Sequence, residues 1–181
     1  MENYVYVLDY LPSGRSTERG FFREPVALAV GESELKLLEI IPRSGVALVP
    51  GSRIPAVPVN GVAPPLDHVR RRIGYEELTS AARTELTSSL EKVVLADPAK
   101  YLRFFNDSPS VSRRFHLLEL FPGIGKRTMQ AIVEERKRGP FTSFADLETR
   151  LHLKSPQLLL VGRIEAELQG VADKYRLFVP D

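Results

Sequence analysis

The chain has 181 residues, of which 43% are hydrophobic and 27% charged, the composition of an ordinary globular protein. It contains no cysteine, which excludes disulfides, thiolate metal ligands and cysteine nucleophiles. No window approaches the ~18 consecutive apolar residues that could span a bilayer. We therefore expect an intracellular, cytoplasmic protein with no secretory signal and no membrane partner.

Short strand-like runs, separated by turn residues, make up the first part of the chain. Residues 4–11 alternate β-branched and aromatic side chains with a period of two, and further apolar runs follow at 26–30, 35–41, 46–49 and 52–54. Strands that recur about every ten residues without an intervening helix are typical of small barrels. The pattern predicts a small OB-like β-barrel, with an SH3-like barrel as the alternative.

A Pro-rich stretch from Pro55 to Pro65 follows the last of these runs. Such stretches often mark domain boundaries. We predict an α+β protein with an N-terminal barrel domain over residues 1–65 and an all-α domain over residues 66–181.

The first inter-strand loop, from Pro12 to Glu24, mixes arginines with two phenylalanines. In an OB barrel this loop borders the nucleic-acid groove, and such residue types pair with phosphates and stack on bases. The alternative is a solvated surface loop pinned to the barrel by its aromatic rings. The candidate nucleic-acid-binding residues here are Arg15, Arg19 and Arg23. Tyr4, Tyr6 and Tyr10 share one face of the first strand, as a stacking platform or as core packing.

Helical spacing of apolar residues replaces the strand pattern after Tyr75. Thr79 or Ser80 is the expected N-cap of a first helix, and Asp97-Pro98 opens a second, short one. We further predict one helix that ends at Leu151, another over residues 156–168, and a short strand from Tyr175 to Val179.

The segment from Phe121 to Lys126, Phe-Pro-Gly-Ile-Gly-Lys, lies between two amphipathic stretches. Glycine reaches positive φ without steric cost, so Gly123 and Gly125 allow a tight turn. Lys126 and Arg127 then open a helix whose first N–H groups have no partner within the helix. Unpaired N–H groups, a helix N-terminus and adjacent cations together form a site for a phosphate oxygen.

The flanks of this hairpin predict an intact helix-hairpin-helix motif over residues 113–138, whose first helix carries Phe115, Leu118 and Phe121. A degenerate copy is predicted over residues 143–168. Its turn, residues 152–156, contains no glycine, so we expect it to be a structural partner only.

The net charge of +2 is unevenly distributed. Residues 111–140 carry seven Lys/Arg against three acidic residues, whereas the rest of the chain sums to −2. A local basic patch on a nearly neutral protein is typical of phosphate contact, and it adds Arg113 and Arg114 to the candidate binding residues.

Residues 113–151 resemble the helix-hairpin-helix repeats of the competence DNA-receptor and Holliday-junction-binding families. The shared pattern is an apolar residue, Pro-Gly-Ile-Gly-Lys, a helix, and then Pro-Phe and Phe-x-x-Leu. The resemblance implies a hairpin backbone that binds phosphates without reading sequence, sometimes with a monovalent cation on its carbonyls. By position it assigns this role to Gly123, Ile124, Gly125, Lys126 and Arg127.

Nearly the whole chain is similar to an uncharacterised archaeal family of predicted RNA-binding proteins with an OB-like barrel followed by this helical domain. The similarity lies in residues 6–12, in residues 121–126 and in residues 173–179. It implies RNA as the ligand, with DNA as the alternative.

Two other classes of function are alternatives to nucleic-acid binding. The three histidines are far apart in sequence, and neither a nucleophile elbow nor a phosphate loop of the G-x-x-x-x-G-K type is present. A nuclease assembled from distant acidic residues is the remaining enzymatic reading. A protein-interaction adaptor that docks through the helical domain is the other alternative, so protein partners stay open. We predict a non-catalytic nucleic-acid binder without a required cofactor.

Overall fold

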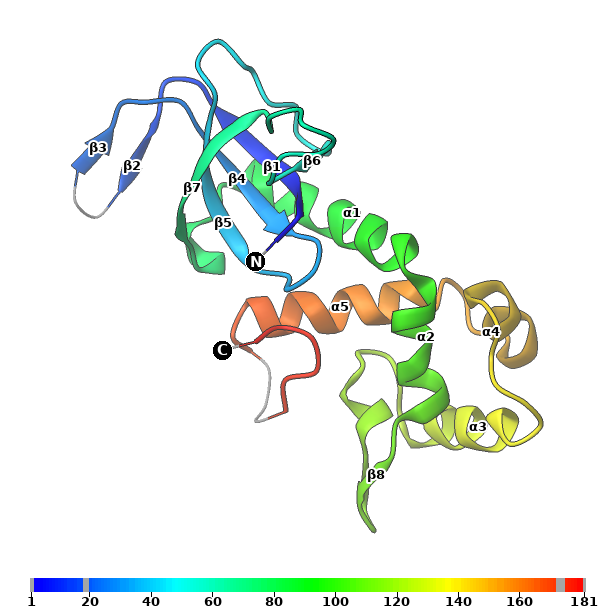
Figure 1. Ribbon diagram of the computed structural model, residues 1–181. Helices are drawn as coiled ribbons and strands as arrows, with labels where there is room; N and C mark the ends of the chain where they lie inside the picture. The colour runs from blue at the N-terminus through cyan, green and yellow to red at the C-terminus, as the bar shows by residue number, and fades with distance from the viewer. Residues whose placement is uncertain (1, 18–19, 172–174, 181) are drawn as a thin grey trace. The chain divides into compact units, whose positions relative to one another are not determined.

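A computed structural model describes residues 2–17, 20–171 and 175–180 of the chain. The fold is mixed α+β, with a curled, five-stranded half-barrel sheet and, among these residues, five α-helices (Figure 1). The chain divides into two compact units. We call Met1–Ser89 with Glu167–Asp181 the sheet unit, and Leu90–Ala166 the helical unit.

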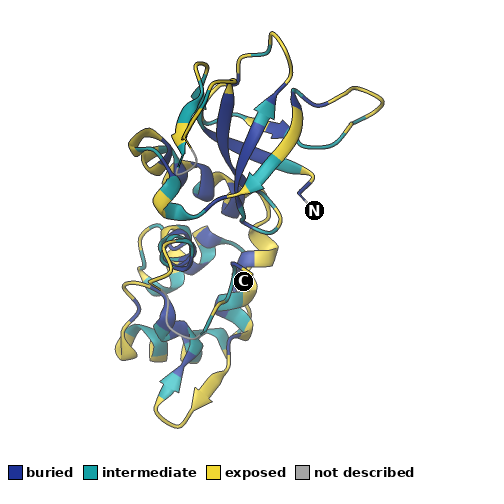
Figure 2. Ribbon diagram, turned by 90° about the vertical axis from the view of Figure 1, so that its left-hand side faces the viewer, coloured by how far each residue is buried: buried dark blue, intermediate teal, exposed yellow. Residues whose placement is uncertain are grey.

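The sheet has the strand order β6-β1-β4-β5-β7, and all neighbouring strands are antiparallel. The strands are β1 (Tyr4–Leu11), β4 (Val26–Gly31), β5 (Leu37–Pro42), β6 (Arg53–Pro55) and β7 (Leu66–Arg72). β4 lies in the middle, and all six of its residues are buried (Figure 2). Its continuous apolar sequence is typical of a strand that is covered on both faces.

Strands are present at four of the five predicted positions, but the prediction for residues 46–49 is wrong. The pairing with β1 begins only after Pro50. The Gly51 N–H donates to the carbonyl oxygen of Val7 over 2.7 Å, and the Val7 N–H donates to that of Ser52 over 2.9 Å. Within the preceding segment, Leu48 is buried in the core and Val49 is exposed.

β7 lies beyond the predicted domain boundary at residue 65. It pairs with β5 from Leu38 opposite Arg72 to Pro42 opposite Leu66, and the sheet unit continues through Ser89. β7 is an edge strand with mostly exposed and charged side chains. Charged edges prevent strand-to-strand aggregation, and here they also conceal the apolar alternation by which a strand is predicted.

A β-bulge in β1 separates the three tyrosines that were predicted to share a face. The register with β4 shifts between Val7 and Asp9, which reverses the alternation of side chains. Tyr10 therefore packs against the core cluster that contains Val7. Tyr6 is buried outside this cluster, so the three rings do not form one stacking platform.

The loop from Pro12 to Glu24 is in part a β-hairpin, formed by β2 (Arg15–Thr17) and β3 (Gly20–Phe22). Phe22 is packed by a cation–π contact, since the Arg70 guanidinium lies 3.9 Å from the centre of its ring. Phe21 is 60% exposed, so only one of the two phenylalanines ties this hairpin to the sheet.

The α-helices begin close to the predicted positions, and side-chain caps explain three of these starts. The helices and 3-10 turns are η1 (Tyr75–Glu77), α1 (Ser80–Ala96), α2 (Pro98–Asp107), η2 (Leu117–Leu120), α3 (Lys126–Arg136), α4 (Phe144–Leu151) and α5 (Gln157–Leu168). Thr79 accepts a hydrogen bond from the Ala82 N–H, and Asp97 accepts one from Lys100. Ser143 likewise caps α4. Such caps satisfy N–H groups that the helix leaves free.

The prediction of a helix immediately before the hairpin is wrong. The chain there forms a second small hairpin, β8 (Ser110–Ser112) and β9 (Phe115–His116), followed by the single 3-10 turn η2. His116 fixes this turn, because its Nδ1 accepts the Leu118 N–H over 3.1 Å. Glu119 accepts the His116 N–H over 2.9 Å, which closes a capping box.

The last described residues, 175–180, form no strand, contrary to the prediction. They are held instead by Glu167, whose carboxylate is 1% exposed at the end of α5. It accepts hydrogen bonds of 2.9, 2.9 and 3.0 Å from the N–H groups of Leu177, Phe178 and Val179. A buried carboxylate needs such donors, so the end of the chain completes the environment of Glu167.

Candidate nucleic-acid interface

The hairpin before α3 begins with a tight turn of four residues. The Ile124 N–H donates to the carbonyl oxygen of Phe121 over 3.0 Å, with Pro122 and Gly123 at the central positions. Gly123 has φ of +88°, as the third residue of a type II turn requires. Proline before glycine is the sequence signature of this turn.

Gly125 differs from Gly123 in its backbone conformation. It is the N-cap of α3, with φ of −87° and ψ of −179°, an extended conformation open to any residue. Positive φ, the expected reason for glycine in this turn, is therefore present at Gly123 but not at Gly125. A Cβ atom at this position would have no neighbour within 4 Å, whereas one at Gly123 would lie 3.4 Å from Leu159. Gly125 leaves open space beside the start of the helix.

The hairpin and the first turn of α3 present main-chain donors to solvent. Within the described residues, no hydrogen bond takes up the N–H groups of Gly123, Gly125, Lys126 or Arg127. The first bond across this N-terminus is from Met129 to the carbonyl oxygen of Gly125, over 2.9 Å. All four residues are exposed. Consecutive free N–H groups at a helix N-terminus suit an anion.

Two buried side chains hold the hairpin in place. Phe121 is 1% exposed and Ile124 is 5% exposed. The ring of Phe121 stacks on that of Phe105, with centroids 5.9 Å apart. Arg163, which is buried, donates to the carbonyl oxygen of Leu120 over 3.3 Å. The hairpin that carries the exposed N–H donors is thus held in place by buried contacts, so binding a ligand costs less conformational entropy.

Only some of the cations around the hairpin are available to a ligand. Lys137 and Arg138 pair with Glu134 and Glu135, and Arg136 donates to the carbonyl oxygens of Phe105 and Ser108. The exposed cations of residues 111–140 that make no ion pair within the described part of the chain are Arg113, Arg114, Lys126 and Arg127. Lys126 and Arg127 lie on the first turn of α3, whereas Arg113 and Arg114 lie in the turn between β8 and β9.

The arginines predicted in the first loop do not form one binding surface. Arg15 faces the protein: it donates to the carbonyl oxygen of Glu77 over 2.6 Å, and its guanidinium lies 3.5 Å from the Glu39 carboxylate. The prediction of Arg15 as a ligand-binding residue is therefore not supported by its contacts. Arg19 lies outside the described residues. Arg23 is exposed and makes no ion pair with them.

Glu39 is the centre of an ion cluster that the sequence reading did not identify. Its side chain is fully buried, yet it pairs with Arg15, Arg70 and Arg71, and Arg71 also pairs with Glu77 over 2.6 Å. Hydrogen bonding to Glu77 raises the pKa of Arg71 against the opposing effect of burial. The available signal was a single acid within the apolar run Leu37–Ile41. Such an acid is retained only with partners, which the arginines of β7 supply.

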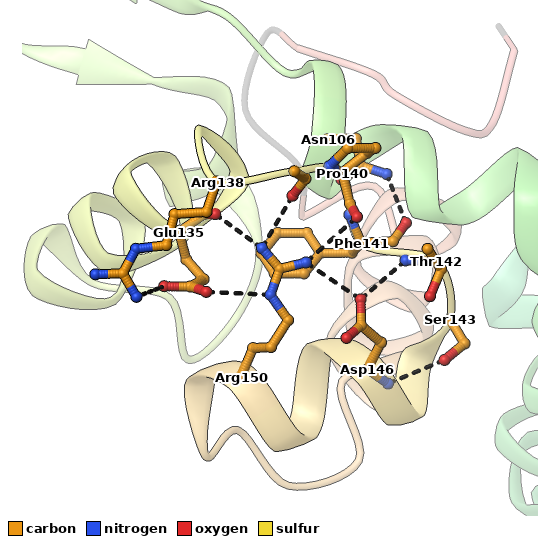
Figure 3. Close-up of polar contacts among 10 residues, drawn as sticks. Asn106, Glu135, Arg138, Pro140, Phe141, Thr142, Ser143, Asp146 and Arg150 are labelled. Atoms are coloured by element: carbon orange, nitrogen blue, oxygen red, sulfur yellow. Dashed lines mark hydrogen bonds and ion pairs between the residues drawn. The ribbon is translucent and has the colours of Figure 1, made fainter.

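Arg150 on α4 fixes the opposite end of α3 (Figure 3). Its guanidinium donates to the Glu135 carboxylate over 3.1 Å and to Asp146 over 3.2 Å. It also donates to three carbonyl oxygens at the C-terminus of α3 and just beyond it, those of Glu135, Gly139 and Pro140. The group lies 4.5 Å from the centre of the Phe141 ring. The planar fork of arginine suits these divergent acceptors, and lysine could not reach them together.

Neither a cluster of metal-ligating side chains nor a membrane-spanning helix is found in the described part of the chain. Residues 2–17, 20–171 and 175–180 contain no group of three or more His, Cys, Asp or Glu side chains placed to hold a metal ion. None of the helices there combines the length and the hydropathy needed to cross a bilayer. The monovalent cation implied by the hairpin resemblance stays a prediction.

Comparisons with known proteins place the chain in a family. Residues 1–180 match the family described as "Protein of unknown function (DUF655)". The chain is 41% identical over 179 residues to the uncharacterized protein MJ0038 of Methanocaldococcus jannaschii, covering 98% of this chain and 80% of that protein. It also resembles the crystal structure of Af1531 from Archaeoglobus fulgidus, a DUF655 protein, with a TM-score of 0.86, 40% identity and coverage of 99% of this chain and 100% of that one. The chain therefore belongs to the DUF655 family.

Proposed function

We propose that this protein is a non-catalytic binder of a nucleic-acid backbone, and that residues 121–127 contact its phosphates. One observation carries the proposal: the free N–H groups of Gly123, Gly125, Lys126 and Arg127 stand beside two unpaired, exposed cations. A phosphate accepts several donors at once and carries the charge that these cations attract. Arg113 and Arg114 extend the positive potential, and Arg23 is a further candidate on the sheet unit.

RNA is the proposed ligand and DNA the alternative. The preference follows from the similarity to predicted RNA-binding proteins, since contacts to phosphate carry no sequence information. The half-barrel supports an OB-like barrel in this binder. The hairpin before α3 supports a variant helix-hairpin-helix unit, in which the 3-10 turn η2 takes the place of the first helix.

Fluorescence anisotropy with single-stranded RNA, stem-loop RNA and duplex DNA tests the proposal. Phosphate contacts make the logarithm of the binding constant fall linearly with the logarithm of the salt concentration. The magnitude of this salt slope is roughly 0.7 per contact for single strands and roughly 0.9 for duplexes. We expect binding at low salt, and a double variant K126Q/R127Q whose salt slope is smaller by roughly 1.4 to 1.8.

The matched control is the double variant K137Q/R138Q. It removes the same number of positive charges just after the end of the same helix, but from side chains already paired with Glu134 and Glu135. We expect it to bind nearly as the native protein does. Absence of binding to all three probes at low salt, or equal losses in the two double variants, would overturn the proposal. Nucleic-acid binding that does not change with salt concentration would argue against phosphate contacts and favour the protein-interaction adaptor.

A further inference from the structure

A groove of about 410 Å³ lies on the helical unit beside α2. Its apolar surface comes from Phe104, Pro109 and Leu117, and Lys100 and Arg103 of α2 stand at its border. Phe104 is only partly buried, so part of its ring is accessible to a ligand. An aromatic and aliphatic surface with cations at its edge is an uncommon combination for a surface that meets only water.

Two aromatic rings connect the wall of the groove to the base of the hairpin. Phe104 meets Phe121 edge to face, with centroids 6.4 Å apart and planes at 73°. Phe121 is the first residue of the turn that presents the free N–H groups. The wall of the groove is therefore in contact with the first residue of the hairpin.

The chemistry of the lining suits a nucleobase. A base has two apolar faces, which stack on aromatic rings, and a polar edge. Phe104 and Leu117 offer contact to the faces, and Asp107 and Ser108 supply polar groups to the edge. Lys100 adds positive charge beside the attached phosphates, whereas Arg103 pairs with Asp107 over 3.7 Å. An apolar peptide side chain would use the same surface, but it would not need the cations.

We propose that this groove takes an unstacked base of the strand whose phosphates lie on the hairpin. The inference rests on the proposed function and adds a preference to it. A base that is paired in a duplex is not free to enter the groove. The protein is accordingly selective for single-stranded segments over duplexes, although the hairpin alone reads neither sequence nor strandedness.

Removal of the bases from the ligand separates the two contacts. A single-stranded oligonucleotide is compared by anisotropy with a strand of equal length made of abasic sugar-phosphate units, which keeps every phosphate. We expect the native protein to bind the complete strand more tightly by roughly 5- to 150-fold, the range found for one stacked base. In F104L, which keeps apolar bulk but loses the ring, most of this preference should vanish, while abasic binding stays at the native level. L95A, which removes an apolar side chain that is 50% exposed on α1, is the control and should behave as the native protein.

A second measurement on the native protein guards against a folding defect in F104L. Single strands that carry 4-thiouridine are irradiated in the complex, and the crosslinked peptide is identified by mass spectrometry. The groove predicts crosslinks within residues 100–117. Equal affinity for complete and abasic strands, or crosslinks only outside this range, overturns the groove while leaving phosphate binding by the hairpin intact. If the native protein binds neither strand, the proposed function itself fails. The same preference for bases in native protein and F104L also contradicts the groove.

Discussion

The rings of Phe105 and Phe121 lie almost parallel, with centroids 5.9 Å apart and planes at 19°, and they join α2 to the hairpin. Both rings are buried. F121L keeps most of the volume but loses the stacking, which contributes about 1 kcal/mol beyond the buried area. We expect a decrease of about 1 kcal/mol in the free energy of unfolding, and one of about 3 kcal/mol or more for F121A. Urea denaturation followed by circular dichroism measures both, and equal effects would contradict a specific contribution from the ring.

Alanine substitutions at the two hairpin glycines should distinguish an effect on stability from an effect on the ligand's access to the main-chain donors. G123A places a Cβ at a positive φ, and the strain costs about 1 kcal/mol. G125A is unstrained and meets no neighbour, so its stability should stay within about 0.5 kcal/mol of the native value. G125A should nevertheless weaken nucleic-acid binding, because its methyl group stands beside the donors. Denaturation and anisotropy on both variants check this, and a larger loss of stability in G125A would contradict the backbone geometry.

Removal of the charge of Glu39 should destabilise the sheet unit. E39Q leaves Arg15, Arg70 and Arg71 around a neutral buried group. Removing one partner of a buried ion pair lowers the free energy of unfolding by about 3 kcal/mol. E32Q breaks the exposed pair with Arg53 and should change the free energy of unfolding by less than about 1 kcal/mol. Urea denaturation compares them. Similar effects would mean that the arginines of Glu39 turn to solvent when it is neutral.

His116 should make the stability depend on pH. Burial lowers its pKa below the ordinary 6.5, and the nearby Arg136 adds to this, against the opposing effect of Glu119. Neutral His116 accepts the Leu118 N–H at Nδ1, so protonation there removes the cap of η2. Stability should be complete above pH ~6.5 and should fall as the pH drops below it toward the lowered pKa. Thermal melts across this range should show a flatter profile for H116N, whereas H68N, at an exposed histidine, should follow the native curve.

Arg150 should tolerate no cation other than arginine. R150K keeps the charge but loses the planar fork that reaches Glu135, Asp146 and the carbonyl oxygens at the end of α3. We expect a lower melting temperature in R150K than in R138K, which alters an exposed pair with the same Glu135. Equal melting temperatures would show that the carbonyl contacts add nothing to the charge pair.

Sequence reasoning located the elements whose signals are local. The Thr79 and Asp97-Pro98 caps, the hairpin turn at Gly123 and the alternation in β1 each depend on neighbouring residues alone. They are present in the structure. β7 and the ion cluster of Glu39 could not be found in this way, since both depend on pairing between residues about thirty positions apart.

For the candidate site, the sequence predicted the hairpin residues that carry the free N–H groups, but only part of the arrangement around them. The count of cations around the hairpin did not show that Lys137 and Arg138 are paired, because this depends on side-chain geometry. Arg15 was assigned to the ligand for the same reason, although it belongs to the Glu39 cluster. Phe104 carried no signal of its own, since a half-buried ring on α2 resembles any core residue.

Glu167 gives the last residues of the chain an unusual exchange behaviour. Amide protons near a terminus normally exchange with deuterium within the dead time of the experiment, because the ends fray. The amides of Leu177, Phe178 and Val179 are instead bonded to one buried carboxylate. They will exchange as a single group, at a rate set by the release of Glu167. Deuterium uptake at three adjacent amides is therefore a direct measure of how firmly the chain end is attached.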